Sequence, residues 1–211
     1  HTAVGFCALS ANTSGVRNTA LGRQSLRDNT TGCCNVAIGS NALISATSGD
    51  FNVAIGGGSM TTAVVTGNLN TAVGACSLSA ITSGTLNSVV GSCSGLAITT
   101  GQQNSAIGIN TLCSNTTGSR NTALGGSSFA ANTTGNDNTA AGHGALSTNT
   151  TAHNNTAIGR ASLQANTEGH SNAAVGMQSL NANTTGDLNT AVGYQALDTN
   201  TTASHNTAVG A

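Results

Sequence analysis

Hydrophobic and polar positions recur along this chain at a fixed spacing. The string Asn-Thr-Ala-Val-Gly at 189–193 returns with small changes at 18–22, 35–39, 121–125 and 155–159. A short fixed period predicts a solenoid, in which each unit buries its apolar residues only against its neighbours. We therefore expect a single repeat array over residues 1–211, with 12 full units and a fragment. The units start at residues 1, 18, 35, 52, 70, 87, 104, 121, 138, 155, 172, 189 and 206, so every step is 17 residues except one of 18.

Each unit reads Asn-Thr-Ala-Val-Gly-x-x-Ala-Leu-x-x-Asn-Thr-Thr-Gly-x-x, and its places are numbered here from first to seventeenth. The opening five places predict a short strand around an aliphatic residue. The fourth place is aliphatic except at Ala141, and the ninth is mostly Leu, with a break at Gly95. We expect both columns, including Val192 and Leu197, to point into a thin coil of two sheets, too narrow for a ligand cavity. The predicted fold class is all-β, a parallel β-solenoid with one coil per unit.

Small residues fill the third and fifth places. The third is Ala in every unit but one, where Val89 replaces it, and the fifth is Gly in all 13 copies. These places share one face of a strand, and a face of Ala and Gly suits either a turn or the close approach of another backbone. We expect close packing between chains, most simply in a trimer. The glycines chosen to represent this close-packing face are Gly22, Gly39, Gly108, Gly125, Gly159 and Gly193.

Asparagine occupies the first place in 12 of 13 units. Coils stacked about 4.8 Å apart would align these amides into a ladder, because each amide both donates and accepts. The later string Asn-Thr-Thr-Gly has turn chemistry. Four consecutive units replace its Asn by Ala46, Val64, Ile81 and Ile98, and we expect the extra residue of the longest unit to widen a turn just after Met60. Twelve such coils would make a rod on the order of 60 Å long.

Composition excludes several classes of protein. The chain has five Arg, no Lys and six acidic residues, so it carries no basic surface for nucleic acid or a membrane. No apolar run approaches the roughly 20 residues of a membrane span, so we expect no membrane insertion of this segment. Four aromatic residues and 28 Gly argue against a large globular core. Because no polar cap is visible at either end, we expect the array to be an excerpt of a longer chain.

The cysteine and histidine residues give little indication of a metal site or a catalytic site. Cys76 and Cys93 occupy the seventh place of adjacent units, so their Cα atoms should lie about 4.8 Å apart, within disulfide range. Stacked side chains point in parallel, which leaves free thiols as the alternative. His153 and His170 share the sixteenth place, with His205 one place away. A metal needs three or four converging ligands, so we expect solvated histidines, no metal, no other cofactor, no catalytic residues and no enzyme.

The glycosylation sequon Asn-x-Ser/Thr is frequent, and all but one copy falls in the twelfth place, at a turn expected to be exposed. Turn chemistry alone would create such a column by accident, whereas a glycosylating pathway would turn it into a stripe of sugars. The sequon asparagines are Asn12, Asn29, Asn115, Asn132, Asn149, Asn154, Asn183 and Asn200.

The strings at 87–91 (Asn-Ser-Val-Val-Gly) and 104–108 (Asn-Ser-Ala-Ile-Gly) resemble the head repeats of trimeric autotransporter adhesins, whose unit is usually shorter. The array Asn-Thr-Ala-Val-Gly-Tyr-Gln-Ala-Leu at 189–197 is also similar to repeats in phage and large-virus fibre proteins. The resemblance covers the whole chain. It implies a left-handed β-roll, three chains side by side in a homotrimer, and a role in surface attachment.

These features favour an extracellular structural or adhesive fibre or filament on a cell or virion surface. Its partners would be further copies of itself and a surface receptor or glycan, bound weakly at many coils. Ice binding is one alternative, because Thr occupies the thirteenth place in 11 of 12 units. A viral fibre module that binds or cleaves carbohydrate is another, although the paired acids and aromatic platform of such enzymes are missing.

Overall fold

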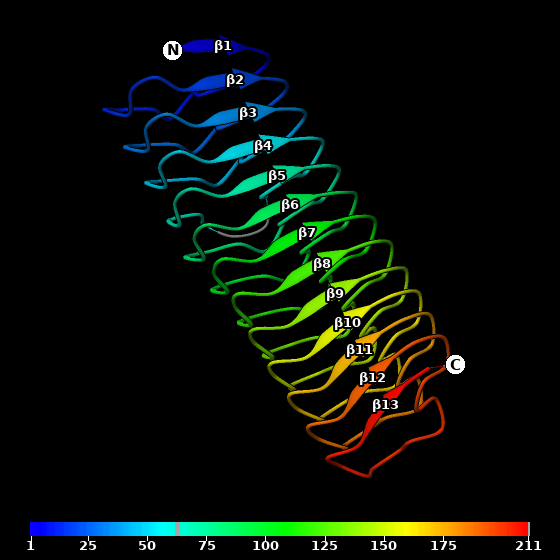
Figure 1. Cartoon of the computed structure of the whole chain (residues 1–211). Coiled ribbons are helices and arrows are strands. Elements are labelled where there is room, and N and C mark those ends of the chain that lie inside the picture. Colours follow the sequence, from blue (N-terminus) through cyan, green and yellow to red (C-terminus); the bar gives the residue numbers. More distant parts are fainter. Residues whose placement is uncertain (62–63, 211) are drawn as a thin grey trace.

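The computed structural model describes residues 1–61 and 64–210, which form a rod of stacked coils (Figure 1). Each unit contributes one three-residue strand, and the thirteen strands pair in sequence order in one sheet. The strands are β1 (Thr2–Val4), β2 (Thr19–Leu21), β3 (Val36–Ile38), β4 (Val53–Ile55), β5 (Thr71–Val73), β6 (Ser88–Val90), β7 (Ser105–Ile107), β8 (Thr122–Leu124), β9 (Thr139–Ala141), β10 (Thr156–Ile158), β11 (Ala173–Val175), β12 (Thr190–Val192) and β13 (Thr207–Val209).

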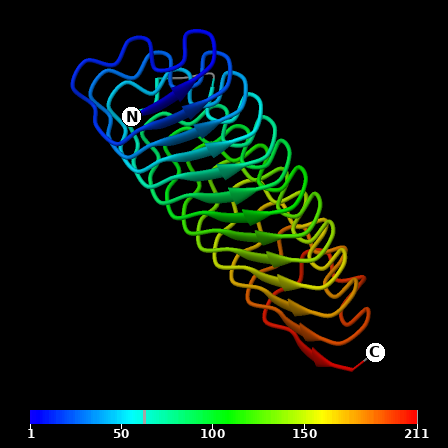
Figure 2. The same ribbon diagram turned by 90° about the horizontal axis from the view of Figure 1, so that it is seen from above.

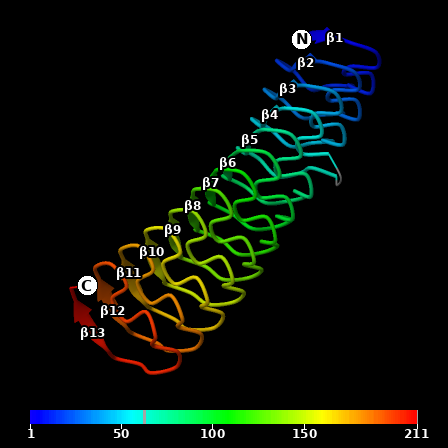
Figure 3. The same ribbon diagram turned by 90° about the vertical axis from the view of Figure 1, so that its right-hand side faces the viewer.

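Neighbouring strands are parallel, and each place of one coil pairs with the same place of the next. Thr190 pairs with Thr207, for example, and Val192 with Val209. The strands lie along one side of the rod with the loops beyond them (Figure 2), and the strand direction turns steadily from β1 to β13 (Figure 3). The expected all-β parallel solenoid with one coil per 17-residue unit is confirmed.

The second sheet expected in each coil is wrong. The ninth-place residues have left-handed backbone, with φ of 48° at both Leu26 and Leu180, and a strand needs negative φ. Left-handed backbone costs a residue other than glycine about 1–3 kcal/mol, and burying a Leu side chain contributes about 1.5–3 kcal/mol. Burial of the Leu side chain therefore offsets the cost of the left-handed backbone at this place. The backbone N–H of Leu26 also donates a hydrogen bond to the carbonyl of Ala42 in the next coil, at 3.1 Å.

The apolar core is built mainly from the third and ninth places. Ala191 in the middle of β12 is fully buried, and so is Leu180 in the ninth place of the preceding coil. The inward direction expected for the Leu column is confirmed there, and Leu197 in the last full coil is partly buried. The direction expected for Val192 is wrong, because 38% of this residue is exposed. A three-residue strand turns only its middle side chain inward, and that side chain is almost always Ala.

The fifth-place glycines lie against their own chain. Gly22 has φ of +135°, and a Cβ added to it would lie 2.6 Å from the carbonyl oxygen of Gly39 in the next coil. Both the backbone conformation and the neighbouring coil therefore exclude a side chain. The Ala/Gly face expected between chains is wrong, since the alanines are inside the coil and these glycines meet the next one. The same close approach occurs at Gly39, Gly108, Gly125, Gly159 and Gly193.

Two asparagine ladders run inside the rod. At the first place, Oδ1 of Asn18 accepts the backbone N–H of Asn35 at 2.9 Å, and Nδ2 of Asn18 donates to the carbonyl of Gly32 at 2.8 Å. Bonds from one first-place amide to the next also occur in the middle of the array, and these confirm the expected ladder. At the twelfth place, Nδ2 of Asn132 donates to Oδ1 of Asn115 at 2.6 Å. Each twelfth-place amide also reaches a carbonyl of its own turn, and this draws it inward.

Apolar residues replace the twelfth-place amides in the middle of the array. Ala46, Ile81 and Ile98 are fully buried, as the pattern implied. In the longest unit, however, Val65 is fully buried and Val64 is 56% exposed, so Val65 fills the position expected of Val64. The widened turn expected just after Met60 lies partly outside the described residues, which omit 62–63.

Candidate interaction surface

The outward face of the sheet presents the same two kinds of side chain in coil after coil. Because the middle residue of each strand points inward, the second- and fourth-place side chains of β1–β13 point outward; we call them the sheet face. The second place is mostly Thr, and the fourth is Val, Leu or Ile in every unit except that of Ala141. Fourth-place residues with more than a third of their surface exposed are Val4, Leu21, Val90, Ile107, Leu124, Ile158, Val175, Val192 and Val209.

Charge is missing from this face, since no charged residue occupies the second or fourth place of any unit. Thirteen strands at about 4.8 Å spacing, each about 10 Å long, give a face on the order of 600 Å². Protein interfaces of standard size bury about 800 Å² per partner. Contiguous exposed apolar patches of several hundred Å² commonly mark interaction sites. The sheet face is therefore uncharged and somewhat smaller than one side of an interface of standard size.

The face is most apolar towards the N-terminal half. Val36 and Val53 replace Thr at the second place of β3 and β4. Three consecutive coils there carry exposed apolar residues at the seventeenth place, just before the strand that follows: Phe51, Leu69 and Leu86. The seventeenth place comes immediately before the first-place Asn, and this brings its side chain to the border of the sheet face.

The cysteines expected to pair lie in register on neighbouring coils. The amide of Cys76 donates to the carbonyl of Gly57 at 3.1 Å, and the amide of Cys93 donates to that of Ala75 at 2.9 Å, so both thiols occupy the same column. The cysteines are free thiols in this structure. A Cys76–Cys93 disulfide therefore stays a prediction.

The sequon asparagines are mostly inside the rod, so the exposed column expected for them is wrong. Their Nδ2 atoms, to which a glycan would be attached, donate to carbonyl groups and to the neighbouring coil. The fully buried ones are Asn29, Asn115, Asn132, Asn149 and Asn183. Asn12 and Asn200, in the outer coils, are half-buried, and Asn154 is exposed. Asn154 is thus the sequon that a folded coil would present.

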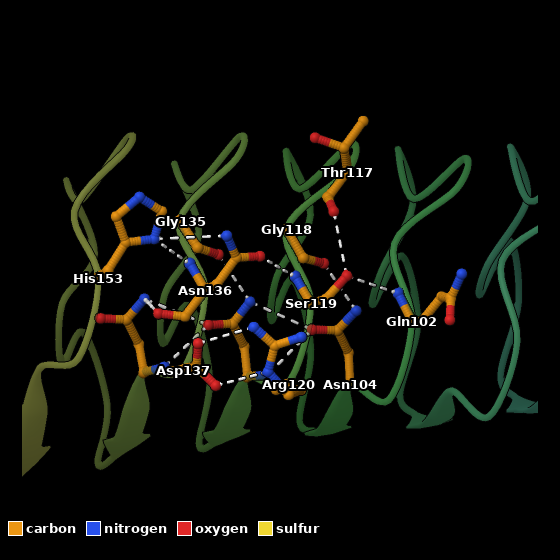
Figure 4. A network of polar contacts seen from close by, with 12 residues as sticks. Gln102, Asn104, Thr117, Gly118, Ser119, Arg120, Gly135, Asn136, Asp137 and His153 are labelled. Atoms are coloured by element: carbon orange, nitrogen blue, oxygen red, sulfur yellow. Dashed lines mark hydrogen bonds and ion pairs between the residues drawn. The ribbon is translucent and has the colours of Figure 1, made fainter.

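Side chains at the sixteenth place form a third ladder (Figure 4). In most coils the backbone N–H at this place donates to the side chain at the same place in the next coil. Ser119 donates to Oδ1 of Asn136 at 2.7 Å, and Asn136 donates to Nδ1 of His153 at 2.8 Å. Gln102 donates to the hydroxyl of Ser119 at 3.0 Å. The signal in the sequence was that nearly every sixteenth-place side chain can accept a hydrogen bond.

The thirteenth-place threonines, which suggested ice binding, also donate hydrogen bonds within the rod. The hydroxyl of Thr116 donates to the carbonyl of Thr133 at 3.0 Å, and Thr133 donates to Thr150 in the same way at 3.0 Å. Bonds of this kind link coil after coil. These hydroxyls therefore act as structural donors.

Within residues 1–61 and 64–210 there is no pocket and no group of three His, Cys, Asp or Glu side chains that could hold a metal ion. The same residues include no helix of the length and apolarity needed to cross a membrane. Comparison with protein families, with curated proteins and with solved structures finds no match to this chain. The solenoid and its sheet face are therefore the features from which a function is proposed.

Proposed function

We propose that this chain is a structural segment of an extracellular fibre and that it associates with further copies of itself through the sheet face. The observation that carries the proposal is the continuous uncharged face of Thr and aliphatic residues along a rod whose described residues form no pocket. Leaving this face in water costs about 25 cal/mol for each Å² of apolar surface that an interface would cover. A second sheet face would cover it along its whole length.

The shape of the face supports another copy of this chain as the occupant. The strand direction turns steadily along the rod (Figure 1), so a twisted surface is needed to follow it. A second copy has the same twist and the same columns. The trimer implied by the resemblance to adhesin heads would place three such rods side by side, and a filament would continue the contact.

The wider role in this proposal is attachment or scaffolding at a cell or virion surface, without catalysis. Receptor or glycan contacts would lie at the exposed corners of the coils, where residues such as Tyr194 and Arg160 vary from unit to unit. Repeated weak contacts along a rod add avidity without a single strong site. Removing whole 17-residue units should then weaken surface binding gradually, whereas abrupt loss on removing one coil would indicate a discrete site.

The mass of the chain in solution tests self-association. We expect an oligomer by analytical ultracentrifugation, and a shift towards monomer for Ile107→Lys combined with Leu124→Lys, because both residues are exposed on neighbouring strands of the sheet face. Thr117→Lys is the matched control, since Thr117 is exposed on a loop outside the sheet (Figure 4). A wild-type chain that stays monomeric at high concentration would refute the proposal.

Ice binding remains the second candidate, now on different residues. The second-place Thr column beside the fourth-place aliphatic column is a regular uncharged array of hydroxyl and methyl groups, which favours it. The turning of the strands ranks it lower, because a crystal plane is flat. Ice binding would be established instead if the wild-type chain is monomeric and shows thermal hysteresis. This hysteresis should then disappear in the monomeric variant with Ile107→Lys and Leu124→Lys.

A further inference from the structure

Two consecutive rungs of the sixteenth-place ladder are histidines. Nδ1 of His153 accepts the backbone N–H of Asn136 at 2.8 Å, and Nδ1 of His170 accepts the N–H of His153 at 2.9 Å. The next rung is a carboxylate, since Oδ1 of Asp187 accepts the N–H of His170 at 2.6 Å. The two imidazole rings stack with centroids 5.4 Å apart and planes inclined by 10°.

This geometry fixes the tautomer of both rings. A backbone N–H can only donate, so each Nδ1 must carry a lone pair and each proton must sit on Nε2. The amide Nδ2 of Asn136, which is also a donor, lies 3.4 Å from Nδ1 of His153 and adds to the same requirement. Both rings are therefore neutral when the ladder is complete.

Protonation would remove both acceptors at once. An imidazolium carries a proton on each nitrogen, so Nδ1 would then face a backbone N–H with no lone pair to offer. The stacked arrangement would also hold two positive charges close together. Both effects oppose the closed ladder at the same two rungs.

We propose that the His153–His170 pair is an acid-sensitive joint in the rod, whose protonation opens the sixteenth-place ladder between Asn136 and Asp187 and leaves the neighbouring rungs closed. Imidazole is the side chain that normally changes charge between about pH 5 and 8. The joint would therefore loosen one corner of the coils that carry β8 to β11 under mildly acidic conditions. This inference does not depend on self-association of the chain.

The charged groups around the pair decide how it opens. Asp137 lies beside His153 and is already held by Arg120 at 2.6 Å. Asp187 faces His170, and Glu168 is an exposed acid two residues before it. These carboxylates attract an imidazolium, but none supplies the acceptor that the backbone N–H groups of Asn136 and His153 lose. A charged ring is therefore drawn out of the ladder towards the carboxylates.

The chain supplies its own control for this joint. Asn136 and Ser204 occupy the same place as the histidines and accept the N–H of Ser119 at 2.7 Å and of Asp187 at 2.9 Å. Neither side chain titrates between about pH 5 and 8. The double variant His153→Asn with His170→Asn should thus keep the ladder and lose the acid response.

Amide hydrogen exchange followed by NMR on the whole chain tests the joint, with rates corrected for the intrinsic effect of pH. From about pH 7.5 to 5, we expect the protection of the Asn136 and His153 amides to fall about tenfold, which corresponds to the loss of one hydrogen bond at each. The Ser119 and Asp187 amides should keep their protection. In the double variant all four amides should show no such pH dependence.

Two results would overturn the inference. One is unchanged protection at Asn136 and His153 in the wild-type chain across this pH range, or an equal fall in the double variant. The other comes from the ¹⁵N chemical shifts of the imidazoles at neutral pH, which report the tautomer directly. A proton on Nδ1 of His153 or His170 is incompatible with the joint, and a proton on Nε2 of both supports it.

Discussion

The side-chain oxygen of Asn29 has no hydrogen-bond partner because Ala46 stands in the next coil where an Asn would donate to it. Elsewhere in the twelfth-place ladder, each oxygen is used by the amide that follows. Asn149 donates to Asn132 at 3.1 Å, and Asn166 donates to Asn149 at 3.1 Å. The ladder therefore leaves an unsatisfied oxygen where it stops inside the rod, at Asn29.

Breaking the ladder in its middle should therefore cost more than moving its end. Asn132→Ala removes a donor from Asn115, an acceptor from Asn149 and the bond to Gly135. Each buried polar group left without a partner costs about 1–3 kcal/mol, so we expect a loss of about 3 kcal/mol or more in the free energy of unfolding, measured with urea. As a control, Ala46→Asn only moves the existing end by one coil and should change stability by about 1 kcal/mol or less.

The break in the Leu column at Gly95 is filled by its neighbours. A Cβ added to Gly95 would lie 3.0 Å from Cδ2 of Leu78, 3.1 Å from Cδ1 of Ile98 and 3.4 Å from Cγ2 of Val89. Val89 is the one third-place residue that is not Ala, and it is fully buried. The extra methyl groups of Val89 and the side chain of Ile98 thus occupy space that a ninth-place Leu fills in other coils.

A mutant cycle with three substitutions tests this compensation. Gly95→Leu alone should destabilise the chain by about 1–3 kcal/mol through overpacking. Gly95→Leu together with Val89→Ala and Ile98→Asn restores the arrangement of the other coils and should recover most of that loss. If the three substitutions were simply additive in thermal unfolding, the residues would not be sharing the same space.

Opposite outcomes are expected for acidic substitutions on the two sides of the strand. Leu180 is fully buried, so Leu180→Asp should cost several kcal/mol by burying a charge without a partner. Val192 belongs to the exposed sheet face, so Val192→Asp should leave the melting temperature nearly unchanged and weaken self-association. Circular dichroism and sedimentation together separate the two effects, and equal destabilisation by both variants would contradict the inward and outward assignment.

The ion pair of Arg120 and Asp137 should make the stability of the chain depend on pH. The guanidinium donates to both carboxylate oxygens, at 2.6 and 2.9 Å, and these hydrogen bonds hold the pKa of Asp137 below its ordinary value. The contribution of Asp137 to stability is therefore present above the pKa of the unfolded chain and lost as the pH falls through the folded pKa. Both side chains are well exposed, so that contribution is small.

Arg120→Gln should raise the pKa of Asp137 towards its ordinary value, which an NMR titration of the carboxyl carbon would measure. The pKa of Asp28, which its partner Arg27 lowers in the same way, serves as the internal control and should not move. An unchanged Asp137 titration in the variant would mean that the ion pair is not populated in solution.

The sequence alone determined the period, the solenoid and the register of the strands. A repeat of 17 residues places every residue beside its counterpart in the next coil, so columns such as the first-place Asn ladder follow directly. The ninth-place Leu column is also readable as core, since Leu recurs there in most units. These features depend on the period and on local chemistry.

Only the tertiary structure decided which side of each strand is buried. Alternation assigns Ala191 and Val192 to opposite faces, but both are apolar, and Val alone gives the stronger signal for the core. In the structure Ala191 is buried and Val192 is exposed, because successive coils stack closely and each coil is narrow. The space across from Leu180 therefore holds a methyl group and not an isopropyl group. The same stacking supplies the partners of the Asn132 amide and of the His153 ring, which are in neighbouring coils. A side chain whose hydrogen-bond partner lies a full coil away cannot be placed from its own unit.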